Sequence, residues 1–170
     1  VWVLSELADK LGFVLVAPTN GMGSWRETQS AAAVESALIA AGRVASIDRT
    51  QVHLAGLSNG GLAVSQLAGT QGARFKSLVF ICPVFDRGQI GSADFVLQNP
   101  GRAMLAITGS RDDRVPLDYV EENVRLINTA GAKIGLQAIP DADHFLIFSH
   151  REQLVKILAA WFSGQADTPR

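Results

Sequence analysis

Short apolar runs alternate with segments of helical periodicity along this chain, and that alternation constrains its fold more than any other feature. The apolar runs predict strands at 13–17, 51–55, 77–84, 103–108 and 134–139. Apolar residues that recur every three or four positions predict helices at 4–11, 27–44, 60–68, 117–129 and 151–162. Strands separated by helices in this order form a mostly parallel sheet with helices on both faces. The predicted fold class is therefore α/β.

The length and charge of the chain exclude several classes of function. With 170 residues, 48% of them hydrophobic, one domain can bury a substantial core, and we assign residues 1–163 to it and 164–170 to a frayed tail. A formal net charge of −1 leaves no excess of Lys and Arg to neutralise nucleic-acid phosphates or an anionic membrane. No apolar stretch approaches the roughly 20 residues that span a bilayer. We expect neither a nucleic-acid nor a membrane partner, and the oligomeric state is left open.

The single cysteine, Cys82, lies in the apolar run 77–85. It has no partner for an internal disulfide, so the pattern predicts a buried, inert thiol. One cysteine favours a reducing compartment such as the cytoplasm, and secretion of a protein without disulfides is the alternative.

A turn rich in glycine and serine, Gly56-Leu-Ser-Asn-Gly-Gly61, follows the predicted strand 51–55 and precedes a helix. It matches Gly-x-Ser-x-Gly, the strand-turn-helix pattern that presents a nucleophilic serine. Ser58 must hold strained backbone angles there, and the residues two positions away must lack side chains so that strand and helix can approach. An ordinary glycine-rich turn is the alternative interpretation.

A serine hydroxyl is a weak nucleophile near neutral pH and needs a base, usually a histidine that a carboxylate orients. His53 lies within a strand, where its side chain points to a sheet face, and His150 begins the last helix. His144 follows the last strand, in the loop 140–145. The carboxyl ends of parallel strands meet at one edge of a sheet, so His144 is the base that should lie near Ser58.

The carboxylate should come from the loop 109–116, which also follows a predicted strand. Asp112 and Asp113 are both candidates, and spacing alone does not separate them. Asp141 and Asp143 are too close in sequence to the histidine to orient it from the far side of its ring. We expect these two to form turns, because aspartate side chains readily bond nearby backbone groups.

These motifs, in this order, resemble the α/β-hydrolase family, and in particular its feruloyl esterases, polyhydroxybutyrate depolymerases and small carboxylesterases. The resemblance covers 4–162 and includes the acid loop Gly109-x-x-Asp112-x-x-Val115-Pro116. It implies Asp112 rather than Asp113 as the acid. It also implies a serine esterase that acts on a small-molecule ester without metal or cofactor. The alternatives are a serine peptidase or acyl-peptide hydrolase, and a catalytically silent hydrolase-fold module that binds a ligand or partner.

The oxyanion formed in ester cleavage needs at least two backbone donors, and the resemblance implies the amide of Asn59 as the first. In that family the second donor follows a strand that would lie between 13–17 and 51–55. The run 13–17, closed by Pro18, predicts a strand covered on both faces. Such a strand cannot leave its backbone unpaired, so we expect a longer polypeptide whose upstream residues supply the missing strand. The alternative is direct pairing of the two strands, with the loop 20–23 as the source of the donor.

Two further expectations concern access to the site. Met22 and Trp25 follow the first predicted strand and should bind the substrate, with packing in a surface loop as the alternative. The stretch 86–100 lies where hydrolases of this family often insert a lid. At about fifteen residues any lid is small, which predicts an open site.

Overall fold

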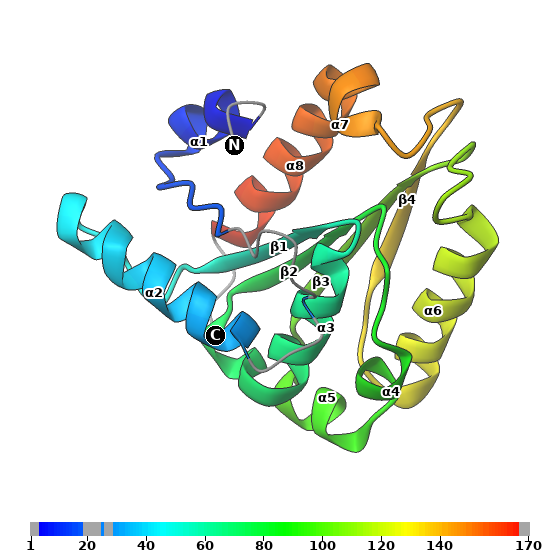
Figure 1. Ribbon diagram of the computed structural model, residues 1–170, viewed down its shortest axis with the longest axis horizontal. Coiled ribbons are helices and arrows are strands. Elements are labelled where there is room, and N and C mark those ends of the chain that lie inside the picture. The colour runs from blue at the N-terminus through cyan, green and yellow to red at the C-terminus, as the bar shows by residue number, and fades with distance from the viewer. Residues whose placement is uncertain (1–3, 19–24, 26–28, 167–170) are drawn as a thin grey trace.

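The computed structural model describes residues 4–18, 25 and 29–166 of the chain. Its centre is a parallel sheet, as the alternation predicted (Figure 1). In spatial order its four strands are β1 (His53–Leu57), β2 (Ser77–Ile81), β3 (Ala103–Gly109) and β4 (Gly135–Ile139). All neighbouring pairs are parallel, so the four carboxyl ends lie along one edge of the sheet.

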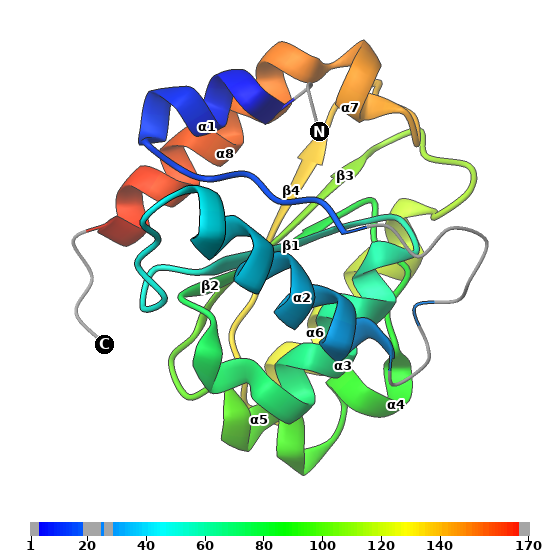
Figure 2. The ribbon, with the colours of Figure 1, turned by 60° about the vertical axis from the view of Figure 1, so that its left-hand side comes forward.

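Helices cover both faces of the sheet (Figures 1 and 2). One layer consists of α2 (Gln29–Val44), α3 (Gly60–Gln71), the short 3-10 helix Gly72–Arg74, α4 (Arg87–Ile90), α5 (Ala93–Gln98) and α6 (Leu117–Ala130). The other consists of α1 (Ser5–Leu11), α7 (Leu146–Ser149) and α8 (Arg151–Ala166). None of the helices in the described part of the chain has the length and apolar character needed to span a bilayer.

Alternate side chains of the central strands divide the core between these two layers. In β2, Leu78 and Phe80 pack with the layer that contains α3, whereas Val79 and Ile81 pack with the layer that contains α8. All four have 3% or less of their surface exposed. The period of two explains why a continuously apolar run forms a strand that is buried on both faces.

The apolar run 13–17 is not a strand, and this prediction was wrong. Residues 13–16 are 37–46% exposed, and among the described residues β1 pairs only with β2. Phe13 instead stacks on His53, with ring centroids 5.3 Å apart, and meets Phe162 edge-on at 5.7 Å. A strand forms only where a neighbour takes its backbone donors and acceptors. No ladder partner for 13–17 occurs in the described residues, so apolar composition alone does not place this run in the sheet.

Helix α8 continues beyond the predicted end at 162 and reaches Ala166. Residues 164–166 of the expected frayed tail are therefore helical, and 167–170 lie outside the described residues.

The segment expected to form a small lid packs against the core instead. It forms α4 and α5, whose Ile90 and Phe95 have no exposed surface. The side-chain amide of Asn99 donates to the carbonyl of Ala68 at 2.8 Å, which ties the end of this segment to the C-terminal half of α3. Ser58 precedes the opposite end of α3, so the segment does not cover the serine.

Candidate active site

Ser58 occupies a sharp turn between β1 and α3. Its φ is 52°, a left-handed value that costs a non-glycine residue about 1–2 kcal/mol. The backbone of the turn is held by β2 and the residues after it. The Ser58 amide donates to the carbonyl of Ile81 at 2.9 Å, and the Ser58 carbonyl accepts from the amide of Val84 at 3.0 Å. The neighbouring strand therefore fixes the serine in its strained conformation.

The glycines around Ser58 differ in what they allow. A Cβ on Gly56 would overlap the carbonyl of Gly60, lying 2.6 Å from its carbon, and a Cβ on Gly61 would lie 2.7 Å from the carbonyl oxygen of Val84. A Cβ on Gly60 would meet nothing within 4 Å. The expectation that both residues two positions from Ser58 must lack side chains is right for Gly56 and wrong for Gly60. The second close approach is at Gly61, where α3 meets the chain that follows β2.

We expect Gly56→Ala to lower the free energy of unfolding by about 3 kcal/mol, because its Cβ would force β1 and α3 apart. The matched variant Gly60→Ala has open space and should stay within about 1 kcal/mol of the parent. Urea unfolding followed by circular dichroism measures both. Equal losses in the two variants would contradict this assignment of the close contact.

His144 links Ser58 to Asp112 through its two ring nitrogens. Nε2 lies 2.9 Å from Oγ of Ser58, and Nδ1 lies 2.7 Å from Oδ2 of Asp112. The three residues come from the loops after β4, β1 and β3, so the shared edge of the sheet brings them together. An ionised Asp112 only accepts, which assigns the proton to Nδ1 and leaves Nε2 to accept from the serine hydroxyl. This geometry suits transfer of the serine proton to His144.

Asp112 is held by backbone groups as well as by the histidine. Its side chain is fully buried, and Oδ1 accepts from the amides of Arg114 at 3.0 Å and Val115 at 2.8 Å. Asp113 is exposed. The structure thus brings Asp112, and not Asp113, to His144.

The remaining histidines and aspartates have other partners. Nδ1 of His53 lies 2.8 Å from Oγ of Ser77, across β1 and β2, and Nδ1 of His150 lies 3.0 Å from Oγ of Ser149. Asp143 accepts from the amide of Phe145 at 2.9 Å, as expected of a residue that forms a turn. Asp141 has a φ of 59° and pairs with Arg111 at 2.9 Å.

The amide of Asn59 directly follows the serine at the start of α3. None of the hydrogen bonds found within the described residues uses it as a donor, which leaves it available to an oxyanion. Met22 and the loop 20–23 lie outside the described residues. Trp25 lies in a turn before α2, where its carbonyl accepts from Oγ of Ser30 at 2.9 Å. A role of Met22 and Trp25 in substrate binding stays a prediction.

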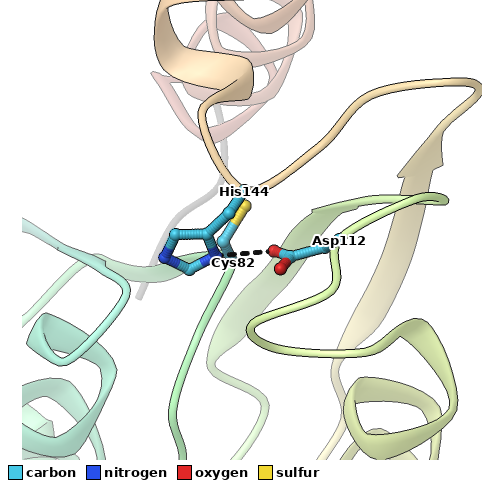
Figure 3. A group of neighbouring side chains, drawn as sticks. All are labelled: Cys82, Asp112 and His144. Atoms are coloured by element: carbon cyan, nitrogen blue, oxygen red, sulfur yellow. Dashed lines mark hydrogen bonds and ion pairs between the residues drawn. The ribbon is translucent and has the colours of Figure 1, made fainter.

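Cys82 lies against the pair formed by His144 and Asp112 (Figure 3). It directly follows β2, has a φ of 43° and has no exposed surface, which confirms the prediction of a buried thiol. Burial raises the pKa of the Cys82 thiol to about 12, and the neighbouring Asp112 carboxylate acts in the same direction. Sequence reasoning identified the burial of Cys82 but not its position beside the acid.

Cys82, Asp112 and His144 form a group that is close enough to share a metal ion, with one ligand atom from each within 4.8 Å of the others. The chemistry of these donors does not fit a metal. Nδ1 of His144 and Oδ2 of Asp112 already bond to each other at 2.7 Å. The Cys82 thiol, whose pKa is raised to about 12, stays protonated near neutral pH. A metal needs a thiolate and a free ring nitrogen. The group is better described as a hydrogen-bonded network.

Solved structures share this arrangement of strands and helices. No protein-family model and no curated protein matches the sequence. A predicted CIB-like hydrolase from Thermoplasma acidophilum is similar with a TM-score of 0.70 at 18% identity, over 95% of this chain and 77% of that chain. The chain has an α/β-hydrolase fold. Arabidopsis thaliana SOBER1 and a variant of it match this α/β-hydrolase fold with TM-scores of 0.59 and 0.58, both at 18% identity and over 82% of this chain. The chain spans 65% and 66% of those two structures, just under two thirds.

The α/β-hydrolase fold predicted from three motifs is therefore confirmed. Along the chain, the serine turn follows β1, Asp112 follows β3 and His144 follows β4. This is the order of nucleophile, acid and histidine that the fold uses when it carries a serine nucleophile.

Proposed function

We propose that the chain is a serine hydrolase that cleaves carboxylic esters through an acyl-enzyme on Ser58. The observation that supports this proposal is the continuous hydrogen-bond path from Oγ of Ser58 through His144 to Asp112, with distances of 2.9 and 2.7 Å. Both distances lie within hydrogen-bond reach, as nucleophilic catalysis by a serine and a histidine base requires. The strained turn adds support, since left-handed backbone at a serine persists only where the surrounding structure holds it.

The reaction begins when Oγ of Ser58 bonds to the ester carbonyl carbon and Nε2 of His144 takes the hydroxyl proton. Asp112 stays ionised and stabilises the imidazolium. The tetrahedral intermediate collapses as His144 gives the proton to the leaving alcohol, and the acyl group remains on Ser58. His144 then takes a proton from water as the water oxygen bonds to the acyl carbon. It returns this proton to Oγ of Ser58 as the acyl bond to Oγ breaks, which releases the carboxylic acid and restores the free serine.

The amide of Asn59 donates to the oxyanion in both tetrahedral intermediates. One such donor typically accounts for a factor of about 100 to 1,000 in turnover. We assign no second donor among the described residues.

Exposed apolar side chains next to the site suit a substrate with a small apolar or aromatic group. Leu57, adjacent to the serine, is 41% exposed, and Phe145, adjacent to the histidine, is 46% exposed. The guanidinium of Arg114 lies 4.7 Å from the centroid of the Phe145 ring, which holds that ring in place.

A fluorophosphonate probe followed by intact-protein mass spectrometry tests this proposal. The parent should gain one adduct and Ser58→Ala none, because the probe reacts only with an activated serine. A folded parent that gains no adduct would favour the silent binding module. Turnover of a short-chain nitrophenyl ester against a peptide anilide then separates esterase from peptidase, and faster cleavage of the anilide would overturn the ester assignment.

A further inference from the structure

The carboxylate of Asp112 has room for one more donor. A carboxylate offers about four acceptor positions. Two backbone amides, those of Arg114 and Val115, bond to Oδ1, and Nδ1 of His144 bonds to Oδ2. The Asp112 side chain is fully buried, so any further donor must come from the protein around it.

Cys82 is placed to be that donor. Strand β2 lies between β1 and β3 in the sheet, so the residue that follows β2 lies between the serine turn and the acid loop. The backbone of Cys82 is fixed there, because its amide donates to the carbonyl of Ile107 in β3 at 2.8 Å. Its Sγ lies within 4.8 Å of both a carboxylate oxygen of Asp112 and a ring nitrogen of His144. Figure 3 shows the side chains of Cys82, Asp112 and His144 close to one another.

The thiol keeps its proton under all ordinary conditions, since burial and the Asp112 charge raise its pKa to about 12. A protonated thiol is a weak donor. The backbone amide of Gly109 and the hydroxyl of Thr108 also face the sulfur and oppose this rise. Asp112 is the negative charge in this group, and it attracts the thiol proton.

We propose that Cys82 is a positioning residue whose thiol donates to Asp112 and thereby weakens the attraction of that carboxylate for the His144 imidazolium. Its kinetic consequence depends on the proposed serine-hydrolase function, while its effect on His144 does not. The thiol takes up part of the carboxylate charge. It therefore lowers the basicity of His144 and fixes the orientation of Oδ2 toward Nδ1.

Removal of the thiol donor should change the pKa of His144 in a defined direction. Without the thiol proton, Asp112 presents more negative charge to the imidazole, which favours the charged ring and raises the pKa of His144. The other charged groups around His144 stay unchanged in the test variants. They are Arg114, which lies over Phe145, and Asp143 and the pair Arg111–Asp141, on the flanking loops.

An NMR titration of the histidine ring protons tests the proposal without any need for activity. Cys82→Ala should raise the pKa of His144 by about half a pH unit, whereas Cys82→Ser keeps a donor and should not raise it. Val79→Ala is the matched control, because Val79 is a fully buried residue of β2, the strand that precedes Cys82, and belongs to the same core cluster but carries no hydrogen-bond donor in its side chain. Cys82→Gly removes the donor and also suits the φ of 43°, so it serves if the alanine variant does not fold. A His144→Gln spectrum assigns the resonance.

In Cys82→Ala, the acidic limb of the pH profile of kcat/KM for a nitrophenyl ester should shift to higher pH by the same amount as the pKa of His144 measured by NMR. KM should stay constant, because the thiol does not touch the substrate. An unchanged His144 titration in both Cys82→Ala and Cys82→Gly would overturn the proposal, as would an equal rise in Cys82→Ser or Val79→Ala. If the Cys82 variants change the titration of His144 as expected but the parent protein hydrolyses no ester, the proposed function is overturned and the role of Cys82 is still supported.

Discussion

Ser58→Ala should lower kcat for a short-chain nitrophenyl ester by about a million-fold. The reason is that Oγ is the atom that forms the acyl bond and the hydrogen-bond partner of Nε2 at 2.9 Å. Alanine accepts the φ of 52° no better and no worse than serine, so the thermal midpoint should stay close to that of the parent. Steady-state assays with active-site titration measure the loss.

Ser149→Ala is the control for this prediction. Ser149 is an exposed serine that lies near His144 in sequence and bonds to the ring of His150 rather than to Nε2. Its removal should change turnover by less than about twofold. Retention of more than about one per cent of the rate in Ser58→Ala would show that another nucleophile carries the reaction.

Asp112→Asn should lower kcat by about ten-thousand-fold, the second largest effect. Oδ1 of Asp112 accepts two backbone amides, so the asparagine oxygen takes that position and its NH2 group faces His144. A donor at Nδ1 forces the ring proton onto Nε2. Nε2 then cannot accept the proton of Ser58, although the geometry of the site is retained.

Asp113→Asn provides a neighbouring acid-to-amide change without this consequence. Asp113 is exposed, and the carboxylate that bonds to His144 is that of Asp112. We expect a change of less than about threefold, because the charge is lost in a solvent-screened position. Comparable losses in the two variants, whether small or large, would contradict the assignment of Asp112 as the orienting acid.

The positions of Ser58 and His144 were predictable because both follow strands, and the carboxyl ends of parallel strands share an edge. The choice between Asp112 and Asp113 was not predictable from spacing. Asp112 is the residue whose carboxylate meets the amides of Arg114 and Val115, and this depends on how the loop folds. The resemblance to a family supplied that choice where the residues alone did not.

Other structural features depend on which segments of the chain contact each other in the fold, and local sequence patterns do not specify these contacts. The run 13–17 has the composition of a strand but no ladder partner in the described residues. Gly61, and not Gly60, is the glycine of α3 that has no room for a Cβ, because the chain after β2 approaches α3 there. The place of Cys82 beside Asp112 follows from the order of the strands, with β2 between β1 and β3. Strand order is a tertiary property, and local patterns do not encode it.

Left-handed backbone at Ser58, Cys82 and Asp141 places three unfavourable conformations along the edge that carries the reactive groups. Each costs about 1–2 kcal/mol relative to a residue in its preferred region. A directed-evolution experiment that selects for heat resistance alone would gain from glycine at these positions. It would at the same time remove the nucleophile, the thiol donor and the Arg111 ion pair. At Ser58, selection for stability and selection for turnover therefore act in opposite directions.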